Sequence, residues 1–253
     1  MQTNNNYYKE RLHKIWSSPN GLENKKRNLT TDNYKKILSL KARYNNQRCF
    51  IIGGSPSIKN LDLSKLNSEI TFSVNRGYKN FDDKFTHSTY HIIQDKLLFE
   101  EDDITNEIPL DKIDNLILYA GIDFKKNDDK VIYYDYMHMM NYEHKIFEPD
   151  LTKKLVEGYS VIFTCMQIAC YMAFSEIYMI GVDLDFNNIK GHSYTDIKGE
   201  KRRARKSILN QQIMYDYIEK GVKFLNHINI KVFNASPIGC LDCMPRVNFE
   251  ELF

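Results

Sequence analysis

The sequence predicts an α/β fold in which helices cover both faces of a mostly parallel sheet. Short apolar runs alternate with polar or amphipathic segments, which is the pattern of strands joined by helical connections. Such crossover connections place parallel strands side by side and bury the sheet on both faces. The chain has 253 residues, enough for one α/β domain with or without an added arm.

The expected strands are short apolar runs rich in β-branched and aromatic residues. Residues 160–175 are longer, apolar and unlike a strand, so we expect a buried helix there. Residues 198–227 have the spacing of a long amphipathic helix. The expected strands are residues 49–52, 69–74, 88–95, 115–121, 130–136, 176–184 and 230–237.

The first 47 residues differ from the rest because they are rich in Asn, Lys and Tyr. Residues 7–16 and 31–44 are helix-like, and Thr31 or Asp32 is the expected N-cap of the second segment. We therefore predict that residues 1–47 form a helical arm packed on a main domain of residues 48–253.

Composition excludes several classes of protein. The net charge of +2 gives no general reason to expect a nucleic-acid partner. No apolar run approaches 18 residues, and the first residues are polar, so we predict a cytoplasmic protein. The five scattered cysteines are expected to be reduced. Cys240 and Cys243 form a lone C-x-x-C pair, whereas a zinc site needs four ligands, so we expect buried or inert thiols.

Polar residues follow most of the expected strands. In an open parallel sheet, ligands bind beyond the carboxyl ends of the strands, near the point where the strand order reverses. The sequence therefore predicts a cleft at this edge. Its candidate residues are Gly53, Gly54, Ser55, Ser57, Asn75, Arg76, Gln94, Asp95, Asp183, Asp185 and Ser236.

The turn from Gly53 to Ser57 is the first candidate site. Its two glycines can take positive φ and let the backbone approach a ligand closely. Ser57 can cap a following helix or bond a phosphate oxygen. The turn has neither GxGxxG nor the P-loop lysine, so a dinucleotide or an ATP γ-phosphate is not supported. A plain strand-to-helix turn is the alternative.

The next two strand ends supply further polar groups. Asn75 can read a base or ribose edge, and Arg76 can pair with a phosphate, unless the segment is a capped loop with a surface arginine. Asp95 can bind a sugar hydroxyl or a metal ion, and Gln94 precedes it. The acidic run at residues 100–103 is expected to be a solvated face.

The segment from Asp183 to His192 carries the strongest chemical signal. Asp183 and Asp185 can hold a divalent ion on phosphates, or can be one structural and one exposed carboxylate. His192 can act as a general base, because its free pKa lies near neutrality, or can be an exposed loop histidine. Six cations in residues 198–206 can grip a diphosphate, an anionic acceptor or a lipid head group, or form a solvated helix start.

Taken in order, several segments resemble bacterial proteins of surface-polysaccharide clusters. This group is related to the flagellin glycosyltransferases called motility accessory factors and is often labelled pterin-pyrophosphokinase-like. It also resembles the small bacterial sialyltransferases of glycosyltransferase family forty-two, whose fold is a GT-A-like variant of the Rossmann sheet. The segments are residues 48–66, 70–78, 90–95, 158–186 and 231–253.

The sialyltransferase resemblance implies roles for particular residues. His192, in a G-H-S context, matches a general base that takes a proton from the acceptor hydroxyl while CMP leaves, without a metal. Where the family has an asparagine this sequence has Gly54, and where the family has tyrosines it has Asp185 and Ile189. The family also has a lid segment just before the histidine, which is shortened here to residues 184–191. Phe186, Tyr194 and the 198–206 cations can replace the lost phosphate contacts. The matches to the donor-binding positions are Gly53, Gly54, Ser55, Ser57, Asn75, Gln94 and Ser160.

The resulting prediction is a cytoplasmic glycosyltransferase of a surface-glycan pathway, such as lipopolysaccharide or capsule synthesis. Residues 48–253 would bind a CMP-activated acidic sugar, with Asp95 and Asp183 added to the donor site and His192 as base. The expected partners are the donor and a glycan acceptor, with no metal, no other cofactor, no nucleic acid and at most peripheral contact with the inner membrane face. Formation of a homo-oligomer is left open.

Two rival hypotheses remain. The first is a phosphotransferase of the pyrophosphokinase type, which would need magnesium held by Asp95, Asp183 and Asp185. The second is a non-catalytic nucleotide-binding protein of the same pathway.

Overall fold

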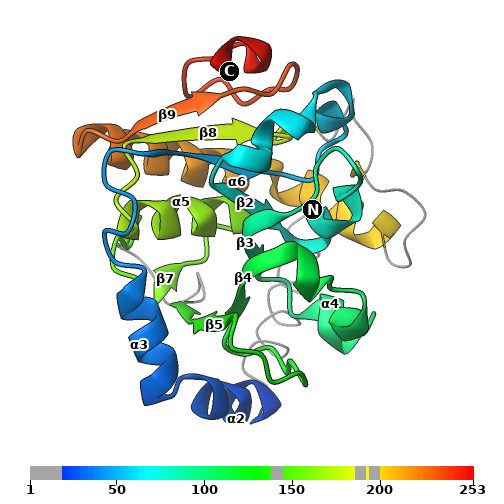
Figure 1. Ribbon diagram of the computed structural model, residues 1–253, viewed down its shortest axis with the longest axis vertical. Coiled ribbons are helices and arrows are strands. Elements are labelled where there is room, and N and C mark those ends of the chain that lie inside the picture. Colours follow the sequence, from blue (N-terminus) through cyan, green and yellow to red (C-terminus); the bar gives the residue numbers. More distant parts are fainter. Residues whose placement is uncertain (1–18, 138–144, 186–191, 194–199) are drawn as a thin grey trace.

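A seven-stranded parallel sheet forms the centre of the computed structural model (Figure 1). The structure describes residues 19–137, 145–185, 192–193 and 200–253, without the side chains of residues 19–20 and 200–209. In spatial order the strands are β5 (Val131–Tyr134), β4 (Ile113–Tyr119), β3 (Ser88–Ile93), β2 (Thr71–Val74), β1 (Arg48–Ile52), β8 (Glu176–Ile180) and β9 (Lys231–Asn234). A second parallel pair consists of β6 (Tyr136–Met137) and β7 (Leu155–Val156).

The strand order reverses between β1 and β8. The chain runs outward from β1 to β5 and then returns to place β8 on the other side of β1. Ile52 and Ile180, the last residues of β1 and β8, are paired, so both strands end at the same level. This is the place where an open α/β sheet binds its ligands, and Gly53 follows directly.

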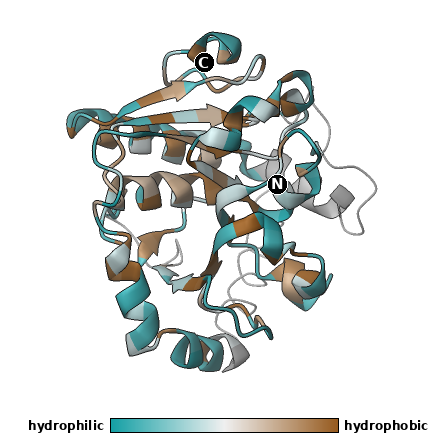
Figure 2. Cartoon of the chain, viewed as in Figure 1, coloured by the Kyte–Doolittle hydropathy of each residue, from teal (hydrophilic) through white to brown (hydrophobic). Residues whose placement is uncertain are grey.

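Both faces of the sheet are buried, but by different kinds of helix. Cys49 and Ile51 of β1 join the larger core cluster, which includes the buried residues of α5. Phe50 and Ile52 face the other way, onto a smaller cluster that includes Leu66. The α/β fold class is therefore confirmed, with short 3₁₀ helices over the second face. Figure 2 shows the strands mostly brown and the outer helices α2 and α3 mostly teal.

The helices in chain order complete the architecture. The α-helices are α2 (Pro19–Asn28), α3 (Thr31–Ser39), α4 (Leu97–Glu100), α5 (Val161–Tyr171) and α6 (Glu200–His227). The 3₁₀ helices are η1 (Pro56–Asn60), η2 (Leu63–Ser68), η3 (Asn75–Asn80), η4 (Ile104–Asn106), η5 (Leu110–Lys112) and η7 (Phe249–Leu252). Both long helices predicted for the main domain are confirmed as α5 and α6.

Helix α5 is buried because nearly all of its side chains are apolar. Ser160 caps it, with its hydroxyl oxygen accepting the N–H of Ile162 at 3.2 Å. Gly221 of α6 lies against α5, where an added Cβ would come within 2.8 Å of the Phe163 ring. The glycine therefore lets the two helices approach closely.

The N-terminal helices begin differently from the sequence prediction. Thr30, rather than Thr31 or Asp32, caps α3, and its hydroxyl oxygen accepts the N–H of Asn33 at 3.2 Å. Helix α2 was not predicted, and the predicted helix at residues 7–16 lies outside the described residues. The division of the chain at residue 47 stays a prediction.

Asparagine side chains tie α2 and α3 to the sheet. The Asn33 amide donates to the Tyr133 carbonyl at 2.8 Å and accepts the Tyr133 N–H at 2.7 Å, as a neighbouring strand would. The Asn28 amide donates to the carbonyls of Ala120 and Ile122, each at 3.0 Å. The Asn33 contacts cover the outer edge of β5, which would otherwise be open to pairing with another chain, and the Asn28 contacts hold α2 against the segment after β4.

Replacing Asn33 by alanine should lower the free energy of unfolding by about 1–3 kcal/mol, because it leaves two groups of the β5 backbone without partners. Urea denaturation measures the change, and Asn106→Ala is the control because Asn106 is exposed. Equal stability of the two variants would show that Asn33 does not hold the edge.

The described part of the chain contains no helix that is long and apolar enough to cross a membrane. All five cysteines are free thiols, as predicted. Cys240 is exposed, whereas burial raises the pKa of the partly buried Cys243 to about 11. A thiol with so high a pKa is a poor nucleophile at neutral pH.

Candidate functional site

The glycine turn after β1 is packed directly against the end of β8. The Gly53 N–H donates to the Ile180 carbonyl at 2.8 Å, and the Ser55 N–H donates to the Gly181 carbonyl at 2.9 Å. A Cβ on Gly53 would lie 2.1 Å from the Gly181 oxygen. Neither Gly53 nor Gly54 has positive φ, contrary to the sequence interpretation, whereas Gly181 does at 62°. Gly53 is needed for close approach of two strand ends.

Hydrogen bonds between Ser57 and Asp183 hold this turn in place. The Ser57 hydroxyl donates to Asp183 Oδ1 at 2.5 Å, and its N–H donates to Oδ2 at 3.3 Å. The Asp183 N–H in turn donates to the Ser55 hydroxyl at 3.2 Å. Burial raises the pKa of Asp183, and the hydrogen bonds from Ser57 oppose that rise. Asp183 is thus the structural carboxylate of the two alternatives, and Ser57 is not a helix cap.

The C-terminal segment supports Asp183 from the other side. The Cys240 N–H donates to the Asp183 carbonyl at 2.7 Å, and the Ser236 hydroxyl oxygen accepts the Val182 N–H at 3.3 Å. Arg246 holds this segment through a hydrogen bond to the Ser236 carbonyl at 2.5 Å. Sequence reasoning placed Ser236 at a strand end but missed Arg246.

His192 lies beside the glycine turn. The N–H of the next residue, Ser193, donates to the Gly54 carbonyl at 2.7 Å. Ser193 is buried and His192 is partly buried, so His192 is not the fully exposed loop histidine of the alternative interpretation. The structure thus joins two segments that were predicted separately as the general base and the nucleotide-binding turn.

A buried histidine organises the neighbouring strand ends. The Nε2 of His91 lies 2.8 Å from the Asn75 carbonyl oxygen, and its Nδ1 lies 2.6 Å from the Ser73 hydroxyl. Because a carbonyl only accepts, Nε2 carries the proton and Nδ1 accepts from Ser73. Asn75 is held at φ 48°, and its side-chain oxygen accepts the Gln94 N–H at 3.4 Å. The two predicted residues Asn75 and Gln94 are therefore in contact.

His91 should make the protein less stable in acid. Burial lowers its pKa from 6.5 to about 4. Between these two values the unfolded chain binds a proton that the folded chain does not, so stability falls as the pH falls through this window. The full loss is about 3 kcal/mol.

Urea denaturation of wild type and His91→Gln measures this effect. The measurements are made at about pH 7, 6, 5 and 4, which spans the range between the pKa values of a free and a buried histidine. Glutamine can still donate to Asn75 but does not titrate, so the variant should lose less stability on acidification. Carboxylates titrate in both proteins and cancel in the comparison. Parallel stability curves would contradict a neutral His91.

Gln94 is oriented by two hydroxyl groups. Its side-chain oxygen accepts hydrogen bonds from Tyr134, at 3.2 Å, and from Thr164. Its NH₂ is therefore the group able to donate to a ligand. Thr164 lies one turn after Ser160 on α5, so these two residues share a helix face near Gln94. Sequence reasoning missed Thr164 and Tyr134, although the four-residue spacing from Ser160 was a usable signal.

Other candidates have structural partners. Arg76 forms an ion pair with Asp102 at 3.1 Å, and both side chains are almost fully buried. Arg76 is therefore neither a surface arginine nor free to bind a phosphate, and the acidic run at residues 100–103 is not wholly solvated. Asp95 is partly buried, and its carboxylate accepts the Leu97 N–H at 3.1 Å just before α4.

Several candidates cannot be placed. Phe186, Ile189, Tyr194 and the side chains of the 198–206 cations lie outside what the structure describes. Within the described ranges, no three or more His, Cys, Asp and Glu side chains are grouped as a metal site requires.

A family model described as "6-hydroxymethylpterin diphosphokinase MptE-like" matches residues 20–189, which include the glycine turn, Asn75, Gln94 and Asp183. The chain belongs to the MptE-like family. The suspected relation to the group with the pterin-pyrophosphokinase label is therefore confirmed. A search among curated proteins finds no match to this MptE-like sequence.

Solved structures of glycosyltransferases are similar to this MptE-like protein in fold. The MAf glycosyltransferase from Magnetospirillum magneticum AMB-1 is 18% identical, with 84% of this chain and 35% of that chain covered and a TM-score of 0.53. The sialyltransferase CstII from Campylobacter jejuni in complex with CMP-3FNeuAc is 13% identical, with 79% and 86% covered and a TM-score of 0.52. The monofunctional α-2,3-sialyltransferase Cst-I from the same organism is 15% identical, with 79% and 80% covered and a TM-score of 0.51.

Proposed function

We propose that this MptE-like protein is a glycosyltransferase that moves an acidic sugar from a CMP-activated donor to a surface glycan. One observation carries the proposal: the Ser193 N–H donates to the Gly54 carbonyl, which places His192 at the glycine turn. The two segments are far apart in the sequence, and each matches a different functional segment of the sialyltransferases. The CMP-3FNeuAc complex of a fold neighbour supports the same class of donor.

Uncharged hydrogen-bond donors of the protein would hold the nucleotide. The backbone of the glycine turn, the Asn75 amide and the Gln94 NH₂ all lie at the carboxyl ends of central strands. The N-terminus of α5, capped by Ser160, is near them through the contact between Thr164 and Gln94. A helix N-terminus favours an anion, so we assign the donor phosphate to the N-terminal end of α5.

The chemistry needs one proton transfer. His192 takes the proton of the acceptor hydroxyl while that oxygen bonds to the anomeric carbon of the donor sugar. The bond between that carbon and the CMP oxygen breaks, and CMP leaves with its electron pair. Positioned N–H groups stabilise the negative charge that develops on the leaving phosphate. We also propose a cytoplasmic site of action in lipopolysaccharide or capsule synthesis.

The family description favours a second candidate, a diphosphokinase acting on a pterin. That reaction implies magnesium, but the predicted ligands do not fit one ion. Asp95 follows β3 and Asp183 follows β8, three strand spacings or about 14 Å apart. Ligands of a magnesium ion lie about 2.1 Å from it. Both oxygens of Asp183 already accept hydrogen bonds from Ser57.

A thermal-shift panel of CMP, CDP, UDP, GDP and ATP, each with and without magnesium, tests the proposal. A ligand at about a hundred times its Kd adds about 2.7 kcal/mol to stability, a shift of several degrees for this chain. CMP should stabilise the protein without metal. Stabilisation only by ATP with magnesium would favour the diphosphokinase. CMP binding without any turnover would favour the third hypothesis, a non-catalytic binding protein.

A further inference from the structure

Helix α2 turns asparagine side chains inward and leaves Leu22 exposed on its outer side, beside the exposed charged residues Glu23, Lys26 and Arg27. Its buried residues Asn24 and Asn28 bond to backbone carbonyls after β4. Leu22 is 56% exposed, and Leu29, directly after the helix, is 40% exposed. A surface helix normally turns its large apolar residues inward, so the exposed leucines at α2 indicate a contact that mixes apolar and charged groups.

Helix α3 continues this exposed apolar surface. It buries Asn33 and Ile37 against the sheet, while Tyr34 and Leu38, one turn apart, are 47% and 44% exposed. Of the eight large hydrophobic side chains that are exposed in the described ranges, four lie between residues 22 and 38. The apolar exposure is therefore concentrated on two consecutive helices.

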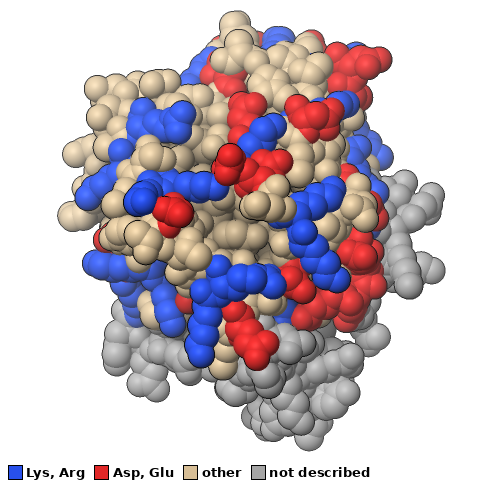
Figure 3. Space-filling view, turned by 60° about the horizontal axis from the view of Figure 1, so that its bottom comes forward, with Lys and Arg blue, Asp and Glu red and all other residues tan. Residues whose placement is uncertain are grey.

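Positive charge is concentrated on the same helices. Residues 19–39 contain five lysines and arginines against two acidic residues, whereas the whole chain has 35 against 33. Three of the five, Lys25, Arg27 and Lys35, form ion pairs with Asp135, Asp123 and Asp32. Figure 3 brings the end of the molecule with α2 and α3 forward, and shows Lys and Arg side chains across its left and centre, with tan surface and smaller groups of Asp and Glu side chains between them. The basic excess and the exposed apolar side chains thus belong to one part of the molecule.

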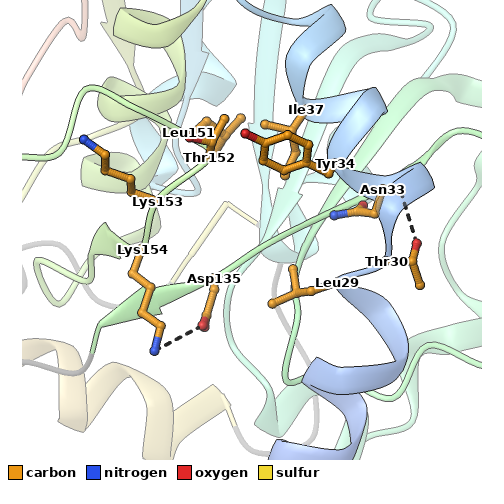
Figure 4. Close-up of a pocket in the computed structure, with 10 residues that line it drawn as sticks. All are labelled: Leu29, Thr30, Asn33, Tyr34, Ile37, Asp135, Leu151, Thr152, Lys153 and Lys154. Atoms are coloured by element: carbon orange, nitrogen blue, oxygen red, sulfur yellow. Dashed lines mark hydrogen bonds and ion pairs between the residues drawn. The ribbon is translucent and has the colours of Figure 1, made fainter.

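Lysines from another segment join this surface at a cavity of about 270 Å³ (Figure 4). Lys153 and Lys154 line it together with Leu29 and Tyr34. Their side chains are 64% and 58% exposed, and their nearest recorded carboxylates lie 3.7 Å away. At that distance and exposure the lysines hold their acidic partners only weakly, so an added anion can compete for them.

We propose that the outer face of α2, α3 and residues 151–154, here the α2–α3 face, docks on an anionic lipid membrane. Leucine and tyrosine side chains would enter the boundary between head groups and acyl chains, while the lysines pair with lipid phosphates. The net positive charge of the face decides for an anionic membrane over an uncharged apolar partner. The inference is independent of the reaction that the protein catalyses.

Co-sedimentation of the full chain with lipid vesicles tests this proposal. Binding is expected to vesicles of phosphatidylglycerol and phosphatidylcholine, not to pure phosphatidylcholine, and to fall in about 0.5 M salt because the charges are screened. The double variants Leu22→Ser/Leu38→Ser and Lys153→Gln/Lys154→Gln should each lower the partition coefficient at least tenfold.

The control variant Ile228→Ser/Lys231→Gln removes an exposed apolar and an exposed basic side chain near β9, at the other end of the molecule (Figure 1). It should bind vesicles like wild type, and circular dichroism should show all variants folded. Equal binding by all variants would overturn the proposal. Absence of binding to anionic vesicles by the wild type would also overturn it. If the wild type then self-associates and Leu22→Ser/Leu38→Ser abolishes this, the face is an interface between copies of this chain.

Discussion

Replacing His192 by asparagine is expected to lower kcat by about 10²–10⁴-fold, the usual contribution of a general base. Asparagine keeps a polar side chain beside the glycine turn but cannot take a proton at neutral pH. The contact between the Ser193 N–H and the Gly54 carbonyl uses only backbone atoms and should survive the change. CMP affinity should therefore stay within about twofold, a difference of less than 0.5 kcal/mol.

His87→Asn is the matched control, because His87 is partly buried like His192 but precedes β3, at the edge of the sheet opposite to the site. It should leave both kcat and the Kd for CMP unchanged. Turnover by His192→Asn at the wild-type rate would assign the base to another residue. Loss of CMP affinity in step with turnover would mean that His192 binds the donor instead.

Gly53→Ala should cause the largest loss of stability among substitutions at the turn. The new Cβ would lie 2.1 Å from the Gly181 oxygen and 2.9 Å from Val182 Cγ2. Since the first contact is with backbone, relief requires β1 and β8 to separate at the point where the site is built. We expect a loss of about 3 kcal/mol or more in the free energy of unfolding, at the upper end of the range for overpacking.

Gly77→Ala provides the comparison, because a Cβ there would meet only the Ser73 side chain at 3.8 Å. Its midpoint in urea should lie close to that of wild type, whereas the midpoint of Gly53→Ala should fall strongly. Since Gly53 also positions Ser55 and Ser57, CMP binding should be lost in Gly53→Ala and kept in Gly77→Ala. Similar midpoints for the two variants would contradict the close approach of the strands.

The fold was largely predictable because the strands are nearly continuous apolar runs. The run ending at Ile52 has no polar residue between Cys49 and Ile52, as a strand buried on both faces requires. The edge of the sheet was not predictable. Asn24, Asn28 and Asn33 look like ordinary polar helix residues, and only their tertiary contacts with backbone groups show that they are buried.

The location of the candidate site could be predicted from the sequence, but the roles of its individual residues could be predicted less well. Strand ends identified Gly53, Asn75 and Gln94, since topology alone brings those positions to one edge. Partners far away in sequence decide the roles: Arg76 is paired with Asp102 and Asp183 with Ser57. Local sequence does not contain these pairings, so a phosphate-binding arginine and a metal-binding aspartate were reasonable hypotheses for side chains that have structural roles.

The most direct test of the proposed function is to incubate the protein with CMP-sialic acid and a panel of glycan acceptors, in the presence of EDTA. We predict release of CMP with equimolar transfer of the sugar, and loss of both in His192→Asn. Absence of transfer, together with magnesium-dependent formation of AMP from ATP and a hydroxymethylpterin, would contradict the glycosyltransferase and establish the diphosphokinase.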